Sequence, residues 1–196
     1  MRYIFTTLIV LLLSSQLFAS SILVPMDKTQ ANHLKAYGIA YFVLENGVTL
    51  EWLLNYRGGS FLLPHLTAIE NELVIRGVSY EIVADGQVNT IKRNISSPEV
   101  NQEVVQLEVA PKIAVYTPGG KQPWDDAVTL VMEYAEIPYD KIYDSTIIAG
   151  GLKEYDWLHL HHEDFTGQYG KFYAAYRNSP WYREQVATLE ASAQSM

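Results

Sequence analysis

The stretch "DWLHLHHEDFTGQYG" (156–170) holds three of the five histidines of this 196-residue chain, followed at once by two carboxylates. If these residues continue a β-strand, successive side chains point to opposite faces, so His159 and His161 share one face and His162 lies on the other. Alternate residues of a strand are about 7 Å apart at Cα, a separation that lets two imidazoles bind one metal ion. The pattern therefore makes His159 and His161 a candidate pair of metal ligands.

Two carboxylates, Glu163 and Asp164, leave two interpretations of this stretch open. Either of them would complete a metal site of two histidines and one carboxylate, for which zinc or another divalent metal is the cofactor to expect. No other cofactor is evident. The alternative is a polar pocket without metal, in which the histidines hydrogen-bond to their neighbours. The ligand residues predicted in this stretch are His161, His162, Glu163 and Asp164.

Two earlier turns also carry polar residues at the ends of expected strands. Asp27 follows the apolar run "SILVPM", and Arg57 opens the turn "RGGS" after "VTLEWLLNY". Because ligands of open parallel sheets bind outside the carboxyl ends of the strands, we expect Asp27 and Arg57 to line the same pocket as His161. Each also has a structural interpretation: Asp27 with Gln30 matches a helix capping box, and "RGGS" matches a tight turn with a solvated arginine.

The sequence contains no complete set of residues for nucleophilic catalysis. The chain has no cysteine, which excludes a thiol nucleophile, a disulfide and a thiolate zinc site. No G-x-S-x-G elbow is present, and Ser60 and Thr117 are isolated hydroxyls without a histidine paired to them in the sequence. The spacings of metalloprotease helices, EF-hand loops, phosphate-binding loops and kinases are also missing.

Apolar periodicity predicts strands that alternate with helices. The expected strands cover 21–26, 48–56, 78–84, 112–117, 139–144 and 156–162. The expected helices are marked by apolar residues within 34–44, 66–73, 88–95, 127–134 and 186–193. This alternation is typical of βαβ units, so the predicted fold is α/β, three-layered and flavodoxin-like, with a mainly parallel doubly wound sheet. Because the last helix, opened by Ser179 and Pro180, meets no stop signal before Met196, we expect this fold to be incomplete.

The first residues of the chain are typical of a signal peptide. Arg2 precedes an apolar run that is short for a membrane span, and Ala19 is the expected last residue before cleavage. An uncleaved membrane anchor is the alternative. We therefore predict an exported bacterial protein, carried by a Sec-type signal to the periplasm or secreted. The segments expected are a signal peptide (1–20), a first βα series (21–97), a connector that includes an edge strand (98–111) and a second βα series (112–196).

Composition and charge exclude some classes of partner. The chain is 48% hydrophobic and 18% charged, as in globular proteins. Its net charge is −8 and it has no run of lysine and arginine, so it would repel a phosphate backbone. We expect no nucleic-acid partner, and a small molecule or a polymer as the ligand.

Three stretches together resemble a family of longer exported bacterial proteins that are often labelled asparagine synthetase B. They are "LNYRGGSFLLP", "PKIAVYTPGGKQPWDDAVTLVMEYAEIPYD" and "YDWLHLHHEDFTGQYGKFY", and "HHEDFTGQ" is the most specific part. The resemblance covers nearly the whole chain after the signal segment. It implies a fold similar to class I glutamine amidotransferases, of which this chain would be the N-terminal half. The C-terminal half, with a glycine-rich strand and a cysteine-containing turn, would be its partner within the same protein.

The activity in that label does not carry over to residues of this chain. Asparagine synthetase needs a cysteine at the mature N-terminus and an S-G-G-x-D-S loop for ATP, and neither is present. Three functions stay open: an exported binding module, the N-terminal part of an amidotransferase-like hydrolase whose nucleophile lies beyond Met196, and a metal-dependent hydrolase at His159 and His161. This chain alone holds no complete catalytic set, so whether it is an enzyme stays undecided at this point.

Overall fold

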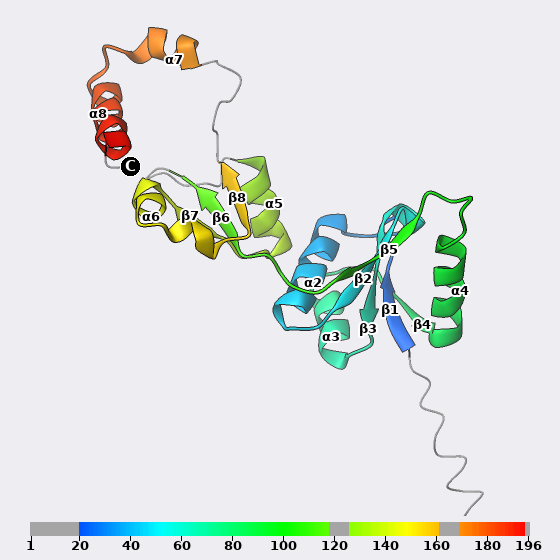
Figure 1. Cartoon of the computed structure of the whole chain (residues 1–196). Helices are drawn as coiled ribbons and strands as arrows, with labels where there is room; N and C mark the ends of the chain where they lie inside the picture. The colour runs from blue at the N-terminus through cyan, green and yellow to red at the C-terminus, as the bar shows by residue number, and fades with distance from the viewer. Residues whose placement is uncertain (1–19, 118–125, 161–168, 195–196) are drawn as a thin grey trace, which may run out of the picture. The chain divides into compact units, whose positions relative to one another are not determined.

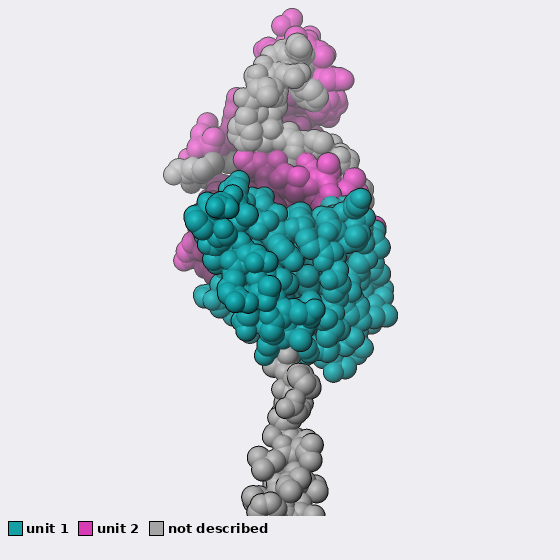
Figure 2. All heavy atoms as spheres, turned by 90° about the vertical axis from the view of Figure 1, so that its right-hand side faces the viewer, with its two compact units in different colours: residues 1–109 teal, residues 110–196 magenta. Residues whose placement is uncertain are grey.

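A computed structural model of the chain describes residues 20–117, 126–160 and 169–194. The chain forms two compact units, with the boundary between Val109 and Ala110 (Figures 1 and 2). Unit 1 spans 1–109 and unit 2 spans 110–196. The predicted signal peptide lies almost wholly outside the described residues. Among the residues that are described, no helix is both long and apolar enough to cross a membrane.

Unit 1 is built on a five-stranded sheet in which every neighbouring pair is antiparallel. Its order is β4-β1-β3-β2-β5. The strands are β1 (Ser20–Val24), β2 (Leu50–Leu54), β3 (Ser60–Pro64), β4 (Glu81–Ala84) and β5 (Glu103–Leu107). The mainly parallel doubly wound sheet predicted from the sequence is therefore wrong for this unit. β5 falls inside the expected connector, where it forms one edge of the sheet beside β2.

The difference comes from one strand that the apolar periodicity did not reveal. "SFLLP" follows "RGGS" directly and forms β3, which runs back against both β2 and β1. A run of three apolar residues is too short to show a period, and it lies between a turn and a proline. Because β3 reverses the direction of the chain after β2, the next helix returns it to a strand antiparallel to β1.

Three helices cover the two faces of this sheet. They are α2 (His33–Glu45), α3 (Thr67–Ile75) and α4 (Asp85–Ile95). Figure 1 shows α2 and α3 on one side of the sheet and α4 on the other, so unit 1 has three layers. The succession β1-α2-β2-β3-α3-β4 interlocks two split β-α-β units, which is the ferredoxin-like arrangement, with α4 and β5 added after it.

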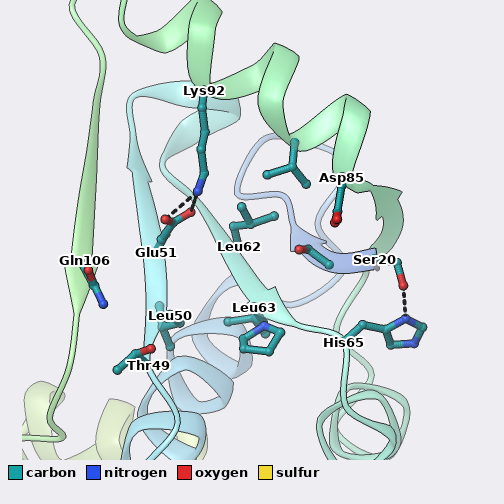
Figure 3. A pocket seen from close by; sticks show the side chains of 13 residues that line it. Ser20, Thr49, Leu50, Glu51, Leu62, Leu63, His65, Asp85, Lys92 and Gln106 are labelled. Atoms are coloured by element: carbon teal, nitrogen blue, oxygen red, sulfur yellow. Dashed lines mark hydrogen bonds and ion pairs between the residues drawn. The ribbon is translucent and has the colours of Figure 1, made fainter. Parts of the chain in front are cut away.

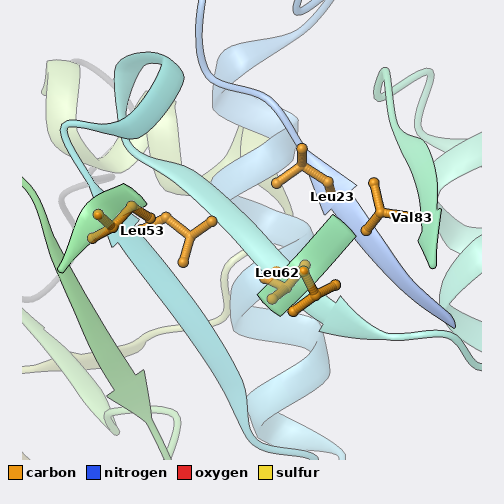
Figure 4. Packing of buried hydrophobic residues seen from close by; sticks show 6 residues of the cluster. Leu23, Leu53, Leu62 and Val83 are labelled. Carbon is orange, nitrogen blue, oxygen red and sulfur yellow. The ribbon is translucent and has the colours of Figure 1, made fainter. Parts of the chain in front are cut away.

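The core of unit 1 is apolar on both faces of the sheet. Leu23 and Leu62, which are register partners, pack toward α4 in one cluster with Leu53 and Val83 (Figure 4). The neighbours of Leu23 on β1, Ile22 and Val24, are fully buried on the other face. A central strand that is buried on both faces has no polar alternation, which is why "SILV" has the sequence signature of a parallel strand.

Unit 2 contains the parallel sheet that the second βα series predicts. Its strands are β6 (Ile113–Tyr116), β7 (Asp140–Ile142) and β8 (Trp157–Leu160), in the order β7-β6-β8, and both pairs are parallel. The other elements of this unit are α5 (Ala127–Ala135), α6 (Asp144–Ile148), the 3₁₀ helix η3 (Gly151–Glu154), α7 (Tyr169–Tyr176) and α8 (Pro180–Gln194). The α/β class is thus confirmed, and the parallel arrangement is confined to this unit.

The stability of unit 1 should depend strongly on Gly58. This residue has φ +83°, and a Cβ added to it would lie 2.4 Å from the carbonyl oxygen of Met26. We expect Gly58→Ala to lower the free energy of unfolding by about 3 kcal/mol, from the left-handed backbone and the overpacking together. Gly47→Ala is the matched control, because Gly47 has φ +72° and nothing within 4 Å of the added carbon. It should cost about 1 kcal/mol. If both variants lost the same unfolding free energy in urea, the close approach of Gly58 to Met26 would be contradicted.

Candidate functional site

The carboxyl ends of β6 and β8 form the switch point of the parallel sheet. From β6 the chain passes through α5 to β7 on one side, and from β7 it passes through α6 to β8 on the other side of β6. The strand order therefore reverses beside β6, between β6 and β8. Open parallel sheets bind their ligands at this position.

A histidine and an aspartate meet at this switch point. His159, on β8, is the register partner of Val115 on β6. Its Nε2 lies 3.0 Å from Oδ1 of Asp126, and the two side chains are only 17% and 14% exposed. Asp126 is the N-cap of α5, where the same oxygen accepts hydrogen bonds from the backbone N–H groups of Val128 and Thr129. The start of α5 and the end of β8 are therefore joined by one carboxylate.

The hydrogen bonds of Asp126 decide the tautomer of His159. Burial alone would raise the pKa of Asp126, but the N–H groups of Thr129 and Val128 and the contact with His159 outweigh burial and lower it. The carboxylate is thus ionised at neutral pH and can only accept. His159 must then donate from Nε2, which leaves Nδ1 as the nitrogen that can accept a proton or bind a metal.

Thr117 adds a buried hydroxyl at the end of β6. Its backbone N–H donates to the carbonyl of Ile142, and the residue is only 5% exposed. Strand alternation from Val115 puts its side chain on the same sheet face as His159. Among the described residues, Oγ1 of Thr117 has no hydrogen-bond partner. A buried hydroxyl without a partner costs stability, so this atom calls for an explanation.

Most of the opening histidine stretch lies outside the described residues. This holds for His161, His162, Glu163 and Asp164, so their predicted roles stay predictions. His159 is described, and its partner Asp126 was not among the predicted site residues. An aspartate before an apolar helical run is a recognisable N-cap signal, but its contact with a histidine 33 residues later is not visible in the sequence. In the part of the chain that is described, no group of three or more histidine and acidic residues is placed to hold a metal.

Asp27 and Arg57 do come together, at the carboxyl ends of β1 and β2. These two strands run in the same direction with β3 between them. The Nε atom of Arg57 lies 2.8 Å from Oδ2 of Asp27, and its Nη1 lies 2.8 Å from Oε1 of Glu81. Two carboxylates thus hold the guanidinium, and the Arg57 side chain is only 27% exposed rather than freely solvated. These residues follow strands of the antiparallel sheet, whereas His161 follows a strand of the parallel sheet, so the single sheet edge expected for one pocket does not exist.

The helix capping box predicted for Asp27 and Gln30 is wrong. The helix begins later, at His33, and its N-cap is Asn32, whose side chain accepts from the backbone N–H of Lys35. Asp27 instead accepts from the backbone N–H of Thr29 at 2.9 Å and makes a local turn. Gln30 is buried, and its side chain forms hydrogen bonds with backbone groups of Pro25 and Ser79. It therefore belongs to the loop between β1 and α2 and not to the helix.

No protein-family model matches this chain, and the comparisons with curated proteins and with solved structures find no match. The resemblance to proteins labelled asparagine synthetase B therefore stays a prediction.

The ion pair of Asp27 should make unit 1 sensitive to acid. Hydrogen bonds from Thr29 and Arg57 hold the pKa of Asp27 well below its ordinary value of 3.8. A lowered pKa in the folded state adds stability above the unfolded-state value, and this contribution is lost as the pH falls toward the folded-state value. We expect Asp27→Asn to be less stable than the wild type at neutral pH, with the difference shrinking below about pH 4. Urea midpoints of both proteins across this range test it, and a difference independent of pH would contradict it.

Proposed function

We propose that this chain is an exported binding module whose site lies at the carboxyl ends of β6 and β8. The observation that carries the proposal is the buried hydroxyl of Thr117, unpartnered among the described residues, on the sheet face of the His159–Asp126 pair. The position is the one at which open parallel sheets bind ligands. Export to the periplasm or secretion, predicted from the first twenty residues, is part of this proposal.

The chemistry of the site favours a neutral polar ligand. Nδ1 of His159 can accept a hydrogen bond, and the Thr117 hydroxyl can donate one or accept one. Asp126 already uses the N–H groups at the start of α5, so this helix end is not free to hold an anion. The net charge of −8 disfavours an anionic ligand further. A hydroxylated or amide-bearing small molecule, or a polymer with such groups, fits these properties.

A Thr117→Val variant tests the site without knowledge of the ligand. Valine keeps the shape of threonine and removes the unpartnered hydroxyl, so we expect the ligand-free protein to gain about 1 kcal/mol of stability in urea unfolding. Ser60→Ala is a matched control, because the hydroxyl of Ser60 is equally buried but donates to the carbonyl of Tyr56. It should lose about 1 kcal/mol. A loss of stability in both variants would show that Thr117 already has a structural partner, and would remove the main support for the proposal.

The ligand itself can be sought by titration of isotope-labelled protein with simple sugars and primary amides. We expect amide shift changes to gather at Thr117, at the start of α5 and at the end of β8. Thr117→Val should weaken the binding about fivefold, which corresponds to one neutral hydrogen bond. Shift changes confined to unit 1, or binding unaffected by both Thr117→Val and His159→Ala, would contradict this placement.

A metal site is the second candidate, and the tautomer of His159 favours it. Histidines that bind metals donate their other ring N–H to a carboxylate, as His159 does to Asp126. Zinc at His159 with His161 as a further ligand would supply an activated water to a metal-dependent hydrolase. The remaining alternative, an amidotransferase-like hydrolase with its nucleophile beyond Met196, stays a prediction from the sequence.

Urea unfolding in EDTA and in zinc separates these candidates. If zinc binds, a concentration one hundred times the dissociation constant should add about 2.7 kcal/mol of stability. The gain should vanish in His159→Ala and in His161→Ala. Asp126→Asn keeps a good N-cap and loses the charge, so it should bind zinc about tenfold more weakly. An unfolding midpoint that zinc does not move would leave the site as a polar pocket without metal.

A further inference from the structure

A cavity of about 630 Å³ lies in unit 1, on the face of the sheet that α4 covers (Figure 3). Its volume suits a small molecule. Residues of α4 and of the four strands β1, β2, β3 and β5 line it. None of the site residues predicted from the sequence is among them, so the cavity is separate from every site considered so far.

Strand alternation decides which side chains of the sheet face this cavity. Leu53 and Leu62 pack toward α4, so Glu51, two residues before Leu53 on β2, points to the same face. Gln106 is the register partner of Glu51 on β5 and therefore shares that face. Thr49 lines the cavity just before β2 begins. One face of the sheet thus presents a carboxylate, an amide and a hydroxyl to the same space.

The helix α4 supplies the opposite wall. Asp85, Val88 and Lys92 line the cavity, and their spacing of three and four residues puts them on one side of the helix. Figure 3 shows the side chains of Asp85 and Lys92 pointing from α4 toward the sheet. Nζ of Lys92 lies 2.6 Å from Oε2 of Glu51. Asp85 lies seven residues earlier, about 10 Å away along the helix axis, so the ion pair and this carboxylate mark two ends of the cavity.

Three polar side chains of the lining are available to a ligand. Thr49, Asp85 and Gln106 form no side-chain hydrogen bond or ion pair with any residue that the structure describes, and all three are exposed to solvent. The carboxylate of Asp85 can only accept, whereas the hydroxyl of Thr49 and the amide of Gln106 can accept or donate. The ammonium of Lys92 is already held by Glu51. The available groups therefore match a ligand that brings N–H and O–H donors.

The charges of the cavity favour a cation. Glu51 and Lys92 offset each other, which leaves the carboxylate of Asp85 as the unbalanced charge of the three. The net charge of −8 attracts cations to the protein and repels anions. Val88 is buried between Asp85 and Lys92 on the same side of α4, so the ligand also meets an apolar contact.

We propose that this cavity binds a small organic cation that carries one ammonium group among several hydroxyl groups, the chemistry of an amino sugar. The ammonium group donates to Asp85, and the hydroxyl groups exchange hydrogen bonds with Thr49 and Gln106. The C–H groups of the ligand pack on Val88. This site is a second one, since the site proposed at the ends of β6 and β8 lies in unit 2 and favours a neutral ligand.

Titration of the isotope-labelled chain with glucosamine tests this site, with glucose as the matched ligand. The two sugars differ only in the group at one carbon, which is an ammonium in glucosamine at about pH 6 and a hydroxyl in glucose. We expect glucosamine to shift the amide signals of residues 49–51, 85–92 and 106. It should bind about tenfold more tightly than glucose, as one hydrogen bond to a charged group provides. N-acetylglucosamine keeps the nitrogen without its charge and should bind like glucose.

Asp85→Asn removes the unbalanced charge and should weaken the binding of glucosamine about tenfold, with no effect on glucose. Glu103→Gln is the matched control, because it removes the same charge from unit 1. Glu103 lies on β5 three residues before Gln106 and so points to the other face of the sheet. This variant should bind glucosamine as the wild type does. Unchanged thermal midpoints of both variants would show that they fold.

Three results would overturn the proposal. The first is an equal affinity for glucosamine and glucose, and the second is the absence of shift changes at the lining residues. The third is an equal loss of affinity in Asp85→Asn and in Glu103→Gln, which would trace the binding to net charge alone. The signals of Thr117 and His159 report separately on the site in unit 2.

Discussion

The tight reversal between β2 and β3 is the constraint on which unit 1 depends. Residues 55–59 turn through several left-handed conformations, and Gly58 packs against the carbonyl oxygen of Met26, where no Cβ fits. This reversal lets β3 insert between β2 and β1, so that every neighbouring pair is antiparallel. It also places Arg57 in the turn beside Asp27 at the end of β1, and it sets the start of β1 against the end of β3. The ion pair between Arg57 and Asp27 follows from it.

Unit 2 obeys a different rule. Its strands are parallel, so their carboxyl ends lie at one edge of the sheet, and the strand order reverses between β6 and β8. In unit 1, Arg57 is satisfied by two carboxylates, as expected of a group that holds a turn in place. In unit 2, Thr117 is buried without a described partner. The first arrangement contributes stability, whereas the second leaves the cost of burying a hydroxyl without a hydrogen bond.

Strand and helix positions could be predicted along most of the chain, because apolar periodicity is a local property. Among the described residues, six of the eight strands and the helices α2, α3, α4, α5 and α8 overlap the expected ranges, and β5 lies in the connector where an edge strand was expected. Pairing could not be predicted in the same way. "SILV" and "SFLLP" are central strands of a sheet that helices cover on both faces. Because both faces of these strands are buried, they are apolar throughout, which is the composition usually seen in parallel strands. Missing β3 then changed the direction of every strand that followed it in unit 1.

The candidate sites show the same division. Asp27, Arg57 and His159 stand out in the sequence, because polar residues at the ends of apolar runs mark strand ends. Their partners do not stand out. Asp126 meets His159 across 33 residues, and Arg57 meets Asp27 across 30. Such contacts depend on strand order and register, which arise from the packing of the whole unit and leave no periodic trace in the chain.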